Sequence, residues 1–245
     1  MAAFEALVLA AIAVIGAVVA ARQPRNPVGW ILCAIPFFIG LLILSAHIYW
    51  SLVLGQPEPS EAAQFVAWLA SWIWIPAMVP AVTLFPLLFP SGRPPTPGWR
   101  WVQWVAIAAC PALFLGTAFV PGRFEDYPIA NPVGARGGLG VAFEVIGWLG
   151  FGLMLTAMLA SVASLVARYR RSRAEERQQI KWVTAASAFF LVIFVTPVED
   201  FAGEDVGFAT LLVGLLIVAV AVAISVLRYR LYDIDIVINK TVVFV

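Results

Sequence analysis

The chain of 245 residues is 62% hydrophobic and 12% charged, with a net charge of +1 at pH 7, and its mean hydropathy is +0.95. This composition excludes a water-soluble fold and is typical of a bundle of membrane spans. Because lipid offers no hydrogen-bond partner to an exposed backbone amide, the spans are expected to be helices.

Charged and Pro/Gly-rich breaks divide the chain into seven apolar segments, each close to or above the roughly 20 residues that a helical span requires. In chain order the segments are Ala3–Ala21, Val28–Leu54, Ala62–Phe89, Trp101–Val120, Leu139–Ala167, Ile180–Val198 and Val206–Leu227. We therefore predict an all-α polytopic membrane bundle of seven transmembrane helices over residues 1–227. A juxtamembrane junction follows over residues 228–245.

The distribution of basic residues predicts the orientation of this bundle. Of the fifteen Lys and Arg residues, thirteen fall in alternate connections, while the other connections hold only Arg123 and Arg136 and are rich in Asp and Glu. Because basic connections stay in the cytoplasm, the N-terminus is predicted outside the cell membrane and the C-terminus inside. The most basic connection, residues 168–181, is expected to anchor the bundle to membrane lipid. Its position at the membrane surface argues against a nucleic-acid partner.

The third segment is rich in proline, and two of its prolines, Pro76 and Pro80, are four residues apart and so on one helix face. A proline inside a helix removes one backbone donor and crowds the preceding turn. The pair is therefore a candidate hinge, through which an outer stimulus moves the inner end of the helix. The alternative is that these prolines serve packing alone, as they do in many membrane helices.

Aromatic and ionisable residues gather in the predicted outer half of the bundle. An outward-facing pocket formed by them would suit an apolar or cationic ligand, because ring faces attract cations and charges within a membrane are costly unless used. The alternative is an interfacial aromatic belt, with the histidine satisfied at the interface. The candidate pocket residues are His47, Trp72, Glu144, Trp148 and Glu199.

The sequence contains no pattern typical of catalysis or cofactor binding. It has no GxxxxGKS phosphate loop, HExxH motif, Cys/His cluster or GxSxG elbow, so no catalytic, metal or cofactor-binding residue is predicted. The single histidine lies in the apolar run ILSAHIYW, which is not the soluble helical context of a phosphoacceptor.

The tetrapeptide NPVG occurs twice, at Asn26–Gly29 and at Asn131–Gly134, once from each side of the predicted membrane. This arrangement would suit an inverted repeat, a mark of secondary transporters, so a small transporter or permease is an alternative function. Asn-Pro followed by Gly is also ordinary turn chemistry. A free-standing membrane protein with a structural or interaction role is the remaining alternative.

The run RYRLYDIDIVINKT at residues 228–241 follows the last apolar segment. Together with the NPVGW, LFPSGR and EERQQIKW runs, it resembles the multi-spanning N-terminal membrane region of actinobacterial-type sensor histidine kinases. Two positions depart from that pattern: Ile236 and Lys240 stand where that family usually has Arg. Arginines at the end of a helix suit its dipole and reach the headgroup layer. The candidate signal junction comprises Arg228, Tyr229, Arg230, Tyr232, Asp233 and Asp235.

This resemblance implies a specific function, which composition and motifs by themselves do not indicate. The chain would be the sensor and membrane anchor of a two-component histidine kinase and would work as a homodimer. A response regulator would be its partner, reached through a kinase region that these residues do not contain. The resemblance also implies that the chain ends at the start of a further helix.

Overall fold

The computed structural model describes residues 2–56, 58–124, 127–172, 174–196 and 198–242, and side chains are described up to Ser225 except at positions 2, 174–176, 178, 179 and 199. The described part is helical, and its one β-bridge is isolated, between Arg123 and Ala130. The helices are α1 (Ala2–Arg22), α2 (Pro27–Val53), α3 (Glu61–Ile73), α4 (Ile75–Val82), α5 (Leu84–Leu88), the short 3-10 helix η1 (Pro97–Trp99), α6 (Arg100–Phe119), α7 (Gly138–Arg171), α8 (Ala174–Val195), α9 (Val198–Ala202) and α10 (Glu204–Val242).

Six described helical stretches are long and apolar enough to cross a membrane, which confirms the all-α multi-pass class. The sixth predicted segment, Ile180–Val198, corresponds to α8, whose apolar part, Ile180–Val195, is shorter than the six long stretches. At 1.5 Å per residue this part spans about 24 Å, which is less than the roughly 30 Å of hydrocarbon. The predicted end of this segment at Val198 was wrong, because α8 ends at Val195 and α9 begins at Val198.

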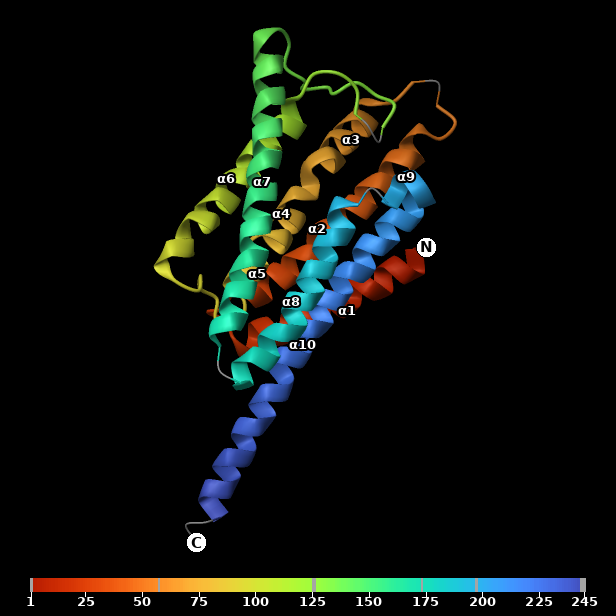
Figure 1. Cartoon of the computed structure of the whole chain (residues 1–245). Coiled ribbons are helices and arrows are strands. Elements are labelled where there is room, and N and C mark those ends of the chain that lie inside the picture. Colours follow the sequence, from red (N-terminus) through yellow and green to blue (C-terminus); the bar gives the residue numbers. More distant parts are fainter. Residues whose placement is uncertain (1, 57, 125–126, 173, 197, 243–245) are drawn as a thin grey trace.

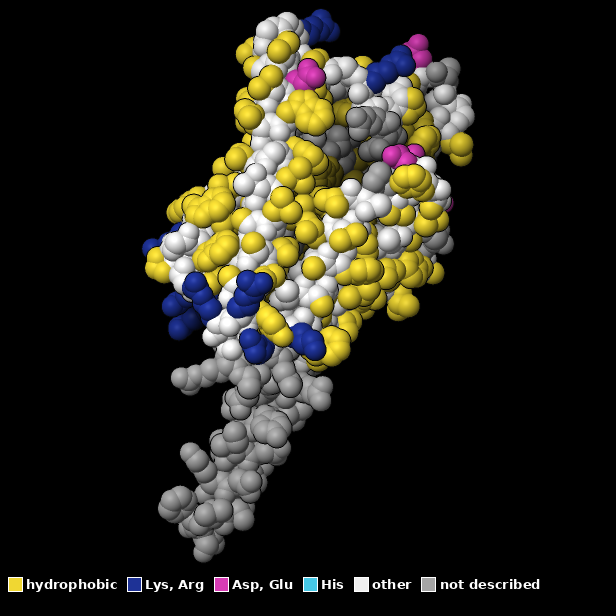
Figure 2. Space-filling model, viewed as in Figure 1, with side chains coloured by type: hydrophobic (Ala, Val, Ile, Leu, Met, Phe, Trp, Pro, Cys, Tyr) yellow, Lys and Arg dark blue, Asp and Glu magenta, His cyan; other side chains and the backbone are white. Residues whose placement is uncertain are grey.

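The bundle has two chemically different ends (Figures 1 and 2). We call the end that holds connections 23–26, 89–99 and 172–173 the basic end, because Lys and Arg side chains gather there in Figure 2. We call the opposite end, with connections 54–60, 120–137 and 196–203, the acidic end, where Asp and Glu side chains lie. The N-terminus lies toward the acidic end, and α10 extends past the basic end (Figure 1).

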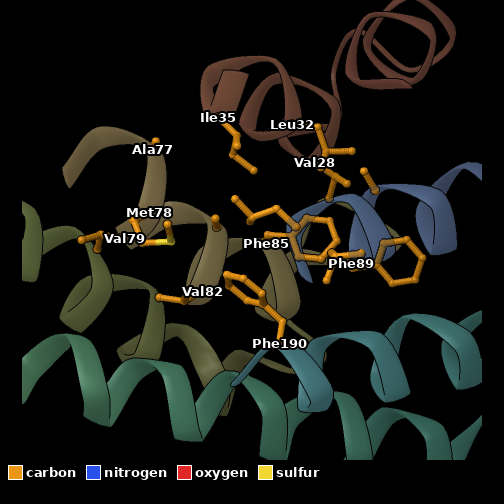
Figure 3. Packing of buried hydrophobic residues seen from close by; sticks show 14 of the residues in the cluster. Val28, Leu32, Ile35, Ala77, Met78, Val79, Val82, Phe85, Phe89 and Phe190 are labelled. Atoms are coloured by element: carbon orange, nitrogen blue, oxygen red, sulfur yellow. The ribbon is translucent and has the colours of Figure 1, made fainter. Parts of the chain in front are cut away.

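The long helices form a ring around the part of the third predicted segment that lies nearer the basic end. Neighbouring pairs follow the order α1, α2, α3–α4, α6, α7, α8 and α10, and α10 packs back on α1. The short α5 contacts α2, α6, α7 and α8, so it lies inside this ring. Figure 3 shows Val82, Phe85 and Phe89 from this inner segment packed against Leu32 of α2 and Phe190 of α8. Consistently, 50% of the Glu61–Leu88 window is buried, against 22% for Pro27–Val53.

The proline-rich segment is broken into three helices at Trp74 and Thr83. Pro76 lies in the first turn of α4, immediately after the first break, whereas Pro80 lies inside α4. At the first break the indole Nε1 of Trp74 donates to the carbonyl of Ser71 at 2.9 Å, and at the second the Thr83 hydroxyl donates to the carbonyl of Val79. Both bonds run from a side chain back to a carbonyl of the preceding turn, which is common where a helix bends or ends. Of the two hinge candidates, Pro76 lies at a break and Pro80 does not.

Glycines let particular helix pairs approach closely. A Cβ on Gly29 of α2 would lie 2.5 Å from the backbone N of Ala20 in α1, and a Cβ on Gly116 of α6 would lie 2.1 Å from Cα of Gly147 in α7. Because real Cβ atoms do not approach other heavy atoms so closely, only a residue without a side chain fits at these crossings. Small residues perform the same role at many helix interfaces in membranes.

Hydrogen bonds at the basic end tie three segments together. The Nδ2 of Asn26 donates to the carbonyl of Pro90 at 2.7 Å. Arg168 near the end of α7 donates from Nη1 to the carbonyl of Phe89 and from Nη2 to the carbonyl of Arg93 at 2.8 Å. Connection 89–93 is therefore held between the start of α2 and the end of α7.

This arrangement predicts a larger loss of stability for Gly92→Ala than for Gly55→Ala. Both glycines have a φ near +75°, so alanine is strained at either site by about 1–2 kcal/mol. Only at Gly92 would the new Cβ also meet a neighbour, at 2.8 Å from Oδ1 of Asn26. Thermal unfolding in detergent should show a lower midpoint for Gly92→Ala, and equal midpoints would mean that this contact does not constrain connection 89–93.

Candidate functional site

A pocket of about 550 Å³ opens toward the acidic end between α3, α6, α7 and connection 120–137. Ser71 and Trp74 of the broken helix form one wall, and Glu144 and Trp148 of α7 form another. Its volume lies in the range of sites that bind small molecules. We call it the outer pocket, because it lies in the predicted outer half of the bundle, and it contains both aromatic rings and opposite charges.

Connection 120–137 is fixed over α6 by hydrogen bonds rather than by regular structure. Asn131 donates from Nδ2 to the carbonyls of Ala118 at 3.0 Å and Val120 at 2.9 Å. The backbone N of Ala135 donates to the carbonyl of Phe119 at 3.0 Å. These bonds satisfy carbonyls at the end of α6, which have no partner within the helix. The connection is therefore docked, and its residues can form a stable wall of the outer pocket.

Aromatic packing attaches the same connection to α2. Tyr127, which lines the outer pocket, packs edge-to-face on the buried Tyr49 of α2, with ring centroids 4.5 Å apart. Tyr49 and Tyr127 belong to a small apolar cluster with Ala63, Ala67 and Ala70 of α3. Aromatic pairs of this geometry contribute about 0.5–1.5 kcal/mol beyond the area that they bury.

The polar groups of the outer pocket divide into two kinds. The hydroxyls of Ser71 and Thr117 donate to carbonyls of their own helices, at 2.8 Å and 2.6 Å. Arg123 and Glu144 are exposed and bring opposite charges to the pocket wall. The outer pocket therefore offers aromatic surface to the apolar part of a ligand and two charged groups to its polar part.

The structure brings together two of the five predicted pocket residues. Glu144 and Trp148, one turn apart on α7, both line the outer pocket. Trp72 lies behind it, between the rings of Trp68 and Phe114. His47 is exposed on α2, where its Nδ1 bonds the carbonyl of Ile43 at 2.9 Å.

The remaining predicted residues lie outside the described side chains. Glu199 is one of these, so its relation to the outer pocket is not described. The six junction residues between Arg228 and Asp235 also have no described side chain, although their backbone continues α10 as helix to Val242.

The pocket residues in connection 120–137 were not among those predicted from the sequence. Arg123, Phe124 and Tyr127 line the pocket only because the connection folds back over α6. In the sequence the aromatic Phe124 and Tyr127 flank the acidic pair Glu125 and Asp126, and this was the signal that could have indicated them. Among the described residues, no group of three or more His, Cys, Asp or Glu could hold a metal ion.

The two NPVG copies share one local structure. In each, the backbone N of the valine donates to the asparagine Oδ1 two residues earlier, at 3.1 Å, for Asn26 and for Asn131 alike. In each, the asparagine Nδ2 donates to carbonyls at or just past the end of a helix, that of Pro90 after α5 or those of Ala118 and Val120 at the end of α6. In both copies the asparagine forms a local turn and attaches it to the end of a helix, and this shared role accounts for the repeated NPVG sequence.

Comparison with protein-family models, curated proteins and solved structures found no match to this chain. The site is consequently interpreted from its own geometry.

Proposed function

We propose that this chain is the sensor and membrane anchor of a two-component histidine kinase in a bacterial cell membrane, with the outer pocket as its input site. The observation that carries the proposal is the path of the broken helix. Trp74, at the first break, lines the outer pocket, and the segment then continues as α4 and α5 into the centre of the ring. A change at the pocket wall would therefore reach the interior through a helix that is already interrupted.

The interior end of this path and α10 border the same cavity. Phe85 and Pro86 of α5 line a narrow apolar cavity together with Leu215 and Val218 of α10. Because packed interiors transmit displacement rather than absorb it, a shift of α5 would press on α10. The α10 helix runs from Glu204 to Val242 without interruption, which suits an element that carries a signal beyond the bundle.

The proposal includes seven crossings with the N-terminus outside. Support comes from the separation of charges between the basic and acidic ends (Figure 2). It also comes from the course of α8, which runs beside α10 between the end of α7 and α9 (Figure 1). A short apolar stretch can cross where flanking residues reach the interface or the bilayer thins locally. In this orientation the outer pocket faces outward and α10 leaves the membrane into the cytoplasm.

The kinase region, the homodimer and the response regulator are parts of the proposal that rest on the resemblance of the 228–241 run. A transporter would also need a path across the membrane that opens to both sides in turn. A pocket open at one end also fits one state of that cycle, so the 228–241 run is what favours a sensor over a transporter.

The test is to replace Arg228 and Arg230 by alanine in the full-length protein. If these charges fix the depth of α10, their loss lets the helix slide by a fraction of a turn, because snorkelling charges no longer resist burial. Basal autophosphorylation in membranes, normalised to protein amount, should then change severalfold.

The matched control removes Arg22 and Arg25, which are exposed at the basic end in another connection. This pair should leave autophosphorylation unchanged, because α10 keeps its own charges. Equal activity in wild type and in the Arg228/Arg230 variant, at equal abundance, would contradict the signalling route along α10. The absence of any autophosphorylation in the full-length wild type would contradict the kinase function itself.

A further inference from the structure

A second, polar pocket of about 290 Å³ lies at the basic end, between connection 91–99 and the last turn of α7. Arg168, Arg171 and Ser172 form its α7 side, and Ser91, Thr96 and Trp99 form the opposite side. Polar lining is unusual in so apolar a chain, and neither the signalling route nor the outer pocket uses it. We call it the inner pocket.

The positive charge of the inner pocket is built into the fold. The guanidinium of Arg168 is fixed by its bonds to the carbonyls of Phe89 and Arg93, so its charge stays at the wall. Arg171 follows one turn later and is exposed, which leaves its planar group able to turn toward an occupant. Among the described side chains that line the inner pocket there is no Asp or Glu. The site is therefore suited to an anion.

The level of the inner pocket relative to the bilayer identifies the source of that anion. Trp99 lines it, and Trp30, Trp101 and Trp182 are exposed near the same end of the bundle, with 58%, 49% and 59% of their surface accessible. Exposed indoles gather in the headgroup layer of a membrane. Basic pockets between helices at this level match the phosphate groups of anionic lipids.

We propose that the inner pocket binds the phosphate group of an anionic phospholipid. Arg171 would pair with the phosphate oxygens in the two-bond geometry that guanidinium favours, while Arg168 supplies fixed charge and the hydroxyls of Ser91 and Thr96 border the headgroup. The inference is independent of the proposed signalling function, because it needs only the described end of the bundle and a membrane around it.

The experiment measures lipid binding to the purified chain in neutral detergent by native mass spectrometry, with phosphatidylglycerol and phosphatidylcholine compared. Wild type should bind phosphatidylglycerol at least about tenfold more tightly than phosphatidylcholine, and Arg171→Gln should weaken phosphatidylglycerol about tenfold, as expected for a charge-assisted bond. Arg170→Gln is the matched control, because Arg170 is exposed beside Arg171 but does not line the inner pocket. It should bind as wild type does.

Three outcomes would overturn the proposal. Equal weakening in both arginine variants would mean a diffuse basic surface rather than a pocket. Both lipids carry a phosphate, but only phosphatidylglycerol has a net negative charge, so equal binding of the two would mean that the inner pocket does not select an anionic headgroup. Displacement of phosphatidylglycerol by inorganic phosphate at matched concentration would identify free phosphate as the ligand. If Arg171→Gln fails to fold, Thr96→Val serves as a second variant on the opposite wall and should also weaken phosphatidylglycerol.

Discussion

Replacing Gly116 by alanine should force α6 away from α7 and lower the thermal midpoint of the protein by roughly 2–12 °C. The new Cβ would lie 2.1 Å from Cα of Gly147 and 2.7 Å from its backbone N. Backbone atoms cannot move aside as a side chain can, so the helices must separate. Overpacking costs about 1–3 kcal/mol, and each kcal/mol shifts the midpoint by about 2–4 °C in a chain of this size.

The matched control is Gly152→Ala on α7, where no atom lies within 4 Å of the added Cβ. Alanine is a better helix former than glycine by about 1 kcal/mol, so this variant should unfold at the same temperature as wild type or slightly above it. Intrinsic tryptophan fluorescence during heating in detergent measures both. A Gly116→Ala midpoint equal to that of wild type would contradict the close crossing of α6 and α7.

The Gly116 variant should also affect the outer pocket, because Gly116 and Gly147 both line it. Separation of α6 from α7 would displace Trp148 relative to Trp74 on the opposite wall. Stability and the shape of the candidate input site are thus coupled through one helix crossing.

A reporter that works only in the cytoplasm should be active when it is fused after Ser172 and silent when it is fused after Gly203. Ser172 follows α7 at the basic end, and Gly203 precedes α10 at the acidic end. The reason is the distribution of charge. Thirteen of the fifteen Lys and Arg residues lie in alternate connections along the chain, and connections rich in basic residues stay in the cytoplasm. The expected effect is all-or-none.

This experiment also decides whether α8 crosses the membrane. A fusion after Gly137, in a second acidic-end connection, is the matched control and should be silent. Activity after both Ser172 and Gly203 would mean that α8 does not cross, so that only six helices span. Activity after Gly203 alone would reverse the orientation and would place the end of α10 outside the cell.

The positions of the spans could be predicted because each depends on local hydropathy. The predicted segment Val28–Leu54 matches α2 at Pro27–Val53 within one residue. Polar residues are costly in the hydrocarbon layer, so a span begins and ends where the apolar run does. Helix ends beyond the apolar runs were less predictable. The α7 helix continues past the predicted Ala167 to Arg171, because basic side chains suit a helix C-terminus and need no lipid around them.

The outer pocket could be predicted only where its residues share one helix. Glu144 and Trp148 are four apart, so helical spacing places them on one face. Trp72 and His47 lie at similar depth in other helices, but depth does not specify the direction of a side chain. Which helix faces which depends on close crossings such as Gly116 with Gly147, and these join residues 31 positions apart in the sequence.

The rest of the fold likewise separates into features that local composition determines and features that only packing determines. Composition along the sequence is enough to specify a membrane bundle, its approximate spans and the contrast between a basic and an acidic end, because each of these properties is a sum over neighbouring residues. Three features depend instead on the simultaneous packing of helices that are distant in the sequence. They are the order of helices in the ring, the burial of α4 and α5 within the bundle, and the docking of Asn131 and Tyr127 onto α6 and α2. Such packing is a matter of three-dimensional fit between surfaces, and hydropathy along the chain carries no information about that fit.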